Sequence, residues 1–148
     1  MKKFICLIMT AVMCALLCAC AANPKCEYDA AIAALSEAEE VNAYVYNHYA
    51  NGEEYTAAYT IDGKTLADMI GGEWEKTSRP KNMNKAISIT IGTQYEICIF
   101  EDNSAIIYCG YAGVFESDRQ YYSFKNPMDI RGICNYVYQN GEEVVIEE

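Results

Sequence analysis

Apolar and polar positions alternate through residues 86–109, which read AISITIGTQYEICIFEDNSAIIYC. This period of two is typical of half-buried β-strands. A turn at Gly92 reverses the chain, and pairing Ile91 with Tyr95 brings six apolar side chains to one face of a hairpin. The six are Ile87, Ile89, Ile91, Tyr95, Ile97 and Ile99. We predict that this face is the core of the domain.

A second turn, at Asp102-Asn103, leads into a third predicted strand at residues 105–110. A four-residue loop sets Ile99 opposite Ile106, which adds Ile106 and Tyr108 to the core face. A loop one residue longer or shorter exchanges the two faces of this strand. The other face carries a mixture of polar and apolar side chains, so it is either partly covered or a contact surface. Its expected members are Glu96, Cys98, Phe100, Ala105, Ile107 and Cys109.

Residues 41–61 are predicted to form two strands around Asn51-Gly52, a dipeptide typical of tight hairpins. The second strand leads into a short helix, which begins at Thr65 with a capping-box-like pattern and ends at Gly71-Gly72. The apolar stripe of this helix is Leu66, Met69 and Ile70. Residues 75–85 contain Pro80 and several charges and are predicted to be a loop.

A loop at residues 111–118 and a strand at residues 119–124 are predicted next. A last helix is expected from Asn126-Pro127 to Asn140-Gly141, because the cap, the apolar spacing and the stop agree. The same Asn-Gly pair also suits a hairpin into residues 144–146, which is the alternative.

The first twenty residues have the pattern of an export signal, with Lys2 and Lys3 before an apolar run. Leu17-Cys18-Ala19-Cys20 resembles the bacterial lipobox, and this resemblance implies lipidation of Cys20 and a membrane tether. Cleavage by ordinary signal peptidase and a retained anchor are the alternatives, although the apolar run is shorter than the ~20 residues a span needs. In each case the domain lies outside the cytoplasm, and with the lipid anchor it lies on the extracytoplasmic face of the cell membrane.

We therefore divide the chain into a signal peptide at residues 1–19, a tether or spacer helix at 20–40 and one α+β domain at 41–148. The spacer has a cap at Asn23-Pro24 and several alanines, but its apolar face is thin. We expect an antiparallel sheet of about five strands, with two helices packed on one face. This β-α-β4-α order is similar to the TATA-binding-protein-like folds, a likeness of topology that carries no function.

The chain has a formal net charge of −10, and removal of the signal leaves 9 basic against 21 acidic side chains. Such a surface repels phosphate backbones, so nucleic acid is not expected as a partner. Four cysteines follow the lipidation position, namely Cys26, Cys98, Cys109 and Cys134. They permit two disulfides in three connectivities, or they stay reduced as small apolar residues.

The predicted register limits the disulfide pairing. It places Cys98 and Cys109 diagonally on one face, at ~7–8 Å, which is at or beyond the limit for a bridge. Cys134 reaches Cys98 only if the last helix covers the mixed face. None of these cysteines lies in a C-x-x-C pair, which argues against a thiol oxidoreductase.

Few sequence patterns point to a catalytic, metal or ligand-binding site. His48 is the only histidine, which excludes a multi-histidine zinc site within one chain. Glu53 and Glu54 fit a charged hairpin tip better than a calcium or glycosidase site. No metal or cofactor is expected. The thirteen tyrosines are unusual, and Tyr44, Tyr46, Trp74, Tyr121 and Tyr122 are the candidate binding surface. Ordinary use of tyrosine in strands, and Trp74 sealing a helix onto the sheet, are the alternatives.

Two functions are consistent with these patterns. The first is a membrane-anchored, non-catalytic binding or sensing module with an envelope protein or glycan as partner, which resembles the many small lipoproteins of Gram-positive bacteria. The second is a small carboxylate-based envelope enzyme that acts on carbohydrate or cell wall. A purely structural spacer is a third hypothesis.

Overall fold

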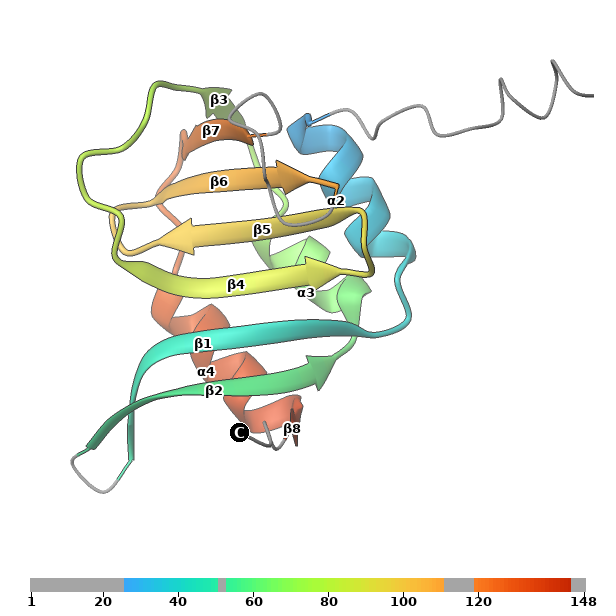
Figure 1. The fold of residues 1–148 in the computed structure, drawn as a ribbon, viewed down its shortest axis with the longest axis vertical. Coiled ribbons are helices and arrows are strands. Elements are labelled where there is room, and N and C mark those ends of the chain that lie inside the picture. Colours follow the sequence, from blue (N-terminus) through green and yellow to red (C-terminus); the bar gives the residue numbers. More distant parts are fainter. Residues whose placement is uncertain (1–25, 51–52, 111–118, 145–148) are drawn as a thin grey trace, which may run out of the picture.

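The computed structural model describes residues 26–50, 53–110 and 119–144 (Figure 1). The predicted signal, the lipobox with Cys20 and the predicted loop at residues 111–118 lie outside this part of the chain. Within the described ranges, no helix is long and apolar enough to cross a membrane. The predictions for residues 1–20 therefore stay predictions.

One antiparallel sheet has eight strands in the order β3-β7-β6-β5-β4-β1-β2-β8 (Figure 1). The strands are β1 (Val41–Ala50), β2 (Glu53–Ile61), β3 (Trp74–Lys76), β4 (Lys85–Ile91), β5 (Tyr95–Phe100), β6 (Ser104–Cys109), β7 (Arg119–Phe124) and β8 (Glu142–Val144). The described helices are α2 (Tyr28–Glu37), α3 (Gly63–Ile70) and α4 (Ile130–Asn140), and they contribute to one core on one face of the sheet. The α+β class is confirmed.

The expected strand and helix counts were wrong, because the sheet has eight strands and the described residues form three helices. The edge strands β3 and β8 have three residues each, which is too short for a periodic pattern. β3 lies at the start of the predicted loop at residues 75–85. β8 follows α4 directly and pairs with β2, so the last segment holds both the predicted helix and a strand.

The central hairpin has the predicted register. Ile91 pairs with Tyr95, Ile89 with Ile97 and Ile87 with Ile99. All six side chains are at most 7% exposed. The hairpin of β1 and β2 is confirmed as well, because Ala50 pairs with Glu53 across residues 51–52. His48 lies in β1, and Glu53 and Glu54 begin β2.

The predicted register of β6 was wrong by one residue. Ile99 pairs with Ala105 and Ile97 pairs with Ile107, so Ile107 faces the helices while Ile106 and Tyr108 face away from them. The cause is a three-residue loop in which Asn103 adopts a left-handed φ of 63° and its backbone N–H donates to the Phe100 carbonyl at 3.2 Å. This turn is a common three-residue hairpin connection.

Asn103→Val is expected to lower the free energy of unfolding by about 2–3 kcal/mol, because a β-branched residue is strained at positive φ and the substitution removes a hydrogen bond. The lost bond is the one that the Asn103 carboxamide oxygen accepts from the Met128 backbone N–H at 2.7 Å. Urea unfolding measures the loss. Asn103→Gly keeps the turn conformation and should lose no more than about half as much. Equal losses would contradict the strain argument.

The structure contradicts the spacer assignment for the described part of residues 20–40. Ala31 and Leu35 of α2 are fully buried in the core, and α2 packs against α3. The apolar face of α2 is thin because one of its two fully buried side chains, Ala31, is small. The contact with α3 is tight, since a Cβ on Gly63 would lie 2.5 Å from the Leu35 carbonyl oxygen.

Both remaining helices begin at aspartate caps that the sequence analysis did not assign. The Asp62 carboxylate accepts from the Thr65 backbone N–H at 2.7 Å, so α3 begins before the predicted Thr65 cap. The Asp129 carboxylate accepts from the Gly132 backbone N–H at 2.9 Å, so α4 begins after Asn126-Pro127. An aspartate in this position satisfies N–H groups that the helix leaves unpaired.

Candidate functional site

The five aromatic residues predicted as one binding surface lie on two faces. Tyr44 pairs with Ser88, and Tyr121 packs beside Cys98 and Ile106 on the face that the helices leave free. Tyr46 belongs to this helix-free face too, where the Lys85 ammonium lies 5.5 Å from its ring centroid. Trp74 and Tyr122 are instead part of the helix-side core. The five candidate residues therefore belong to two separate surfaces.

Trp74 and Tyr122 line an open groove of about 490 Å³ at the β3 edge of the sheet. Its walls come from the start of α2, from β3 and the residues before it, and from β7 with Lys125. The lining residues are Glu27, Tyr28, Asp29, Gly72, Glu73, Trp74, Lys76, Tyr122 and Lys125. Below we call this the aromatic groove. Its volume is within the range of small-molecule binding sites.

Three aromatic rings, those of Tyr28, Trp74 and Tyr122, line the aromatic groove, and Phe124 packs against Trp74. Trp74 stacks on Tyr28 with ring centroids 4.6 Å apart, and it meets Phe124 edge to face at 4.3 Å. Tyr122 lies 5.8 Å from Trp74 in a T-shaped arrangement. The Trp74 indole N–H donates to the Ile70 carbonyl at 3.1 Å, which joins β3 to the end of α3. Trp74 thus packs between helices and sheet and stays half-buried.

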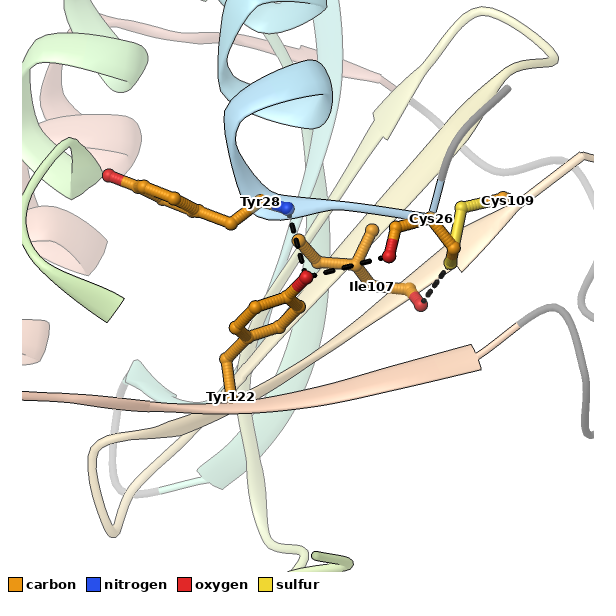
Figure 2. The surroundings of a disulfide bond; sticks show 5 residues. All are labelled: Cys26, Tyr28, Ile107, Cys109 and Tyr122. Carbon is orange, nitrogen blue, oxygen red and sulfur yellow. Dashed lines mark hydrogen bonds between the residues drawn. A yellow bond between two sulfur atoms is a disulfide. The ribbon is translucent and has the colours of Figure 1, made fainter. Parts of the chain in front are cut away.

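Two phenol hydroxyls fix the start of α2 over the sheet, and Figure 2 shows the bonds of one of them, that of Tyr122. The Tyr122 hydroxyl accepts from the Tyr28 backbone N–H at 3.0 Å and donates to the Cys26 carbonyl at 3.4 Å. The Tyr28 hydroxyl donates to the Gly72 carbonyl and accepts from the Gly72 backbone N–H, the latter at 2.7 Å. Both hydroxyls therefore serve the fold.

A disulfide joins Cys26 to Cys109 next to this network, with Cα atoms 5.4 Å apart (Figure 2). It ties the chain two residues before α2 to the end of β6. Cys98 and Cys134 are free thiols. The predicted shared face of Cys98 and Cys109 was wrong, because the shifted β6 register places them on opposite faces. Cys134 lies on α4 near the Ala86 carbonyl, on the helix side.

The charges of the aromatic groove are unevenly distributed. On the strand side, the Lys125 ammonium contacts Glu73 at 2.9 Å and Glu75 at 3.6 Å. On the helix side, Glu27 and Asp29 are exposed. Burial raises the pKa of the Tyr122 phenol above its usual range, its hydrogen bond from Tyr28 lowers it, and the carboxylates of Glu27 and Asp29 raise it further. Negative potential therefore reaches the Tyr122 hydroxyl.

The helix-free face holds a separate polar cluster. The Ser88 hydroxyl donates to the Glu96 carboxylate at 2.6 Å, and the Cys98 thiol donates to the same oxygen at 3.2 Å. Ser88 and Cys98 are at most 1% exposed. Burial, with the Glu96 carboxylate as the next cause, raises the pKa of the Cys98 thiol to about 12. Such a thiol stays protonated and is a poor nucleophile.

The raised thiol pKa values of the buried Cys98 and the half-buried Cys134 predict a loss of stability in alkali. Burial also raises the pKa of Cys134, to about 11, from an ordinary value of about 9. Above about pH 9 the unfolded chain loses thiol protons that the folded chain keeps, so the free energy of unfolding should fall as pH rises to about 11–12. Urea unfolding at about pH 8 and 10.5 measures the fall. Cys98→Ala should make the fall of the free energy of unfolding with pH shallower. An unchanged fall would contradict its assignment to the thiols.

Several residues of the aromatic groove escaped the sequence analysis. Tyr28 was assigned to a spacer, Gly72 was read only as part of a helix stop, and Glu27 and Lys125 carried no motif. Tyr28 lies 44 residues from Gly72 in the sequence and 94 from Tyr122. No local pattern reports such contacts.

Among residues 26–50, 53–110 and 119–144, no three or more His, Cys, Asp and Glu side chains group to hold a metal ion. No protein-family model, curated protein or solved structure matches the chain. The TATA-binding-protein-like topology and the resemblance to small lipoproteins therefore stay predictions. The arrangement of the aromatic groove is suited to non-covalent binding, through aromatic faces and rim charges.

Proposed function

We propose that this chain is an extracytoplasmic, membrane-tethered module that binds a small polar ligand, a glycan fragment being the best match, in the aromatic groove without catalysis. The observation that carries the proposal is the half-buried Trp74 at the side of a groove of about 490 Å³. Aromatic rings combined with nearby polar groups suit ligands that have both apolar faces and hydroxyls.

The groove carboxylates favour binding over catalysis. Glu73 has a side chain that is 71% exposed, and its partner Lys125 neutralises it. Glu27 and Asp29 are also exposed. A general acid of a glycosidase needs a carboxyl that is protonated near neutral pH, a state that burial provides. The enzyme hypothesis therefore has no buried carboxylate pair in its favour among the residues that line the aromatic groove.

Titration of the purified full chain with soluble glycan fragments tests the binding function. Trp74 is the only tryptophan of the chain, so the intrinsic tryptophan emission reports on the aromatic groove alone. A saturable change in emission, with unchanged fragments recovered after incubation, is the expected result. Trp74→Phe removes this reporter, so its affinity and that of the wild-type chain are compared by titration calorimetry. The substitution should keep the fold and weaken binding about tenfold, as the loss of about 1–1.5 kcal/mol of stacking would. Cleaved fragments would establish the enzyme instead.

The tether rests on the lipobox-like residues alone and has its own test. We expect the chain from the membrane fraction to carry a diacylglycerol-sized mass increment, which Cys20→Ala abolishes. Intact-mass analysis measures this increment directly. A form without the lipid that is released into the medium would mean ordinary secretion, and it would leave the aromatic groove as the site of a diffusible binding protein.

A further inference from the structure

We propose that the aromatic groove selects amino sugars, that is, glycan fragments whose ring carries a free protonated amine. This inference rests on the proposed binding function and names the chemical class of the ligand. It follows from how the groove uses its hydrogen-bonding groups and from how its charges pair.

The polar atoms of the aromatic side chains in the groove are already hydrogen-bonded within the protein. The Trp74 indole N–H is bonded to Ile70, and the phenol of Tyr28 is bonded twice to Gly72. The Tyr122 hydroxyl is bonded both to Tyr28 and to Cys26. Tyr122 is only 2% exposed, so the half-buried rings of Tyr28 and Trp74 are the ones that offer a ligand their π surfaces. Such surfaces attract the apolar face of a ring and, through their quadrupole, a cation.

The groove charges favour a cation on the helix side. Three carboxylates and two ammonium groups line the groove, but Lys125 is held by Glu73 and Glu75. No ion pair among the described residues involves Glu27 or Asp29. Asp29 lies in the first turn of α2, where it also offsets the helix dipole. Burial is the main cause of the raised pKa of Tyr122, and the carboxylates of Glu27 and Asp29 add to it from this end of the groove.

Lys76 on β3 is the cation of the groove without a carboxylate partner among the described residues. It repels an amine on the strand side and therefore directs it toward Glu27 and Asp29. The chain as a whole has a formal charge of −10, which raises the local concentration of cationic ligands. A ligand that combines a sugar ring for Trp74 with an ammonium group for the helix side satisfies both parts of the groove.

Three probes test this assignment on the full chain: a glucosamine tetramer with protonated amines, the N-acetylglucosamine tetramer and tetralysine. The Trp74 emission measures each affinity. We expect the glucosamine tetramer to bind at least tenfold more tightly than the acetylated tetramer and tetralysine, and to lose affinity as salt rises. A double substitution, Glu27→Gln with Asp29→Asn, should reduce the difference in affinity between the glucosamine and N-acetylglucosamine tetramers to less than threefold.

The matched control removes two exposed carboxylates elsewhere, through Glu37→Gln with Glu142→Gln. It changes the net charge equally and should leave the preference for the amine intact. Equal binding of the two sugars would overturn this inference and leave the binding function standing. Tighter binding of tetralysine would overturn the sugar assignment. Failure of all three probes to bind, with other glycan fragments failing too, would overturn the proposed function as well.

Discussion

Replacing Cys26 and Cys109 together by serine is expected to lower the free energy of unfolding by about 2–4 kcal/mol. The disulfide closes a long loop, with 83 residues of sequence separation, and so constrains the unfolded chain strongly. The chain-entropy relation gives about 4.5 kcal/mol for a loop of this length as an upper value. Urea unfolding under non-reducing conditions measures the loss.

The control for the disulfide is Cys134→Ser, which removes a half-buried thiol without removing a cross-link. It should cost about 1 kcal/mol or less, as a small change at a partly exposed site does. Adding a reductant to the wild-type chain should reproduce the serine variant. A loss below about 0.5 kcal/mol in the double variant would mean that the bridge does not form in the protein.

Leu35→Ala is expected to lower the free energy of unfolding by about 3 kcal/mol, within the range for large-to-small changes in cores. Leu35 of α2 is 0% exposed in the core that the helices form with the sheet, so its truncation leaves a cavity. Glu37→Ala, two residues further along the same helix and exposed, serves as the control and should change stability by less than about 0.5 kcal/mol. If both substitutions changed the free energy of unfolding by a similarly small amount, α2 would be a spacer and not part of the core.

The central hairpin could be predicted because its apolar pattern and its turn specify one register. Shifting the register of β4 and β5 by one residue would turn the isoleucines away from the core. The β6 register could not be predicted in the same way. Both faces of that strand are apolar, with Ile106 on one and Ile107 on the other, so the pattern accepts either orientation. The left-handed Asn103 decides between them.

The aromatic groove could not be predicted because its residues meet only in the tertiary structure. Trp74 and Tyr122 were among the candidates, but nothing in the sequence separates them from Tyr121, which alternates with Tyr122 on the opposite face of β7. Tyr28 was missed because its helix, α2, was assigned to a spacer. One of the fully buried residues of α2 is Ala31, whose side chain is too small to mark a buried helix face in the sequence. A small apolar residue in an alanine-rich helix is a weak signal of burial.

Where the ligand binds is the most direct test of this account. We would record amide and indole chemical shifts of the isotope-labelled full chain during titration with the glucosamine tetramer. The account predicts that the shifted signals cluster on Tyr28, Gly72, the Trp74 indole and Tyr122, around the aromatic groove. Shifts confined to Tyr46, Tyr108 and Tyr121 would place the ligand on the helix-free face and contradict the central claim.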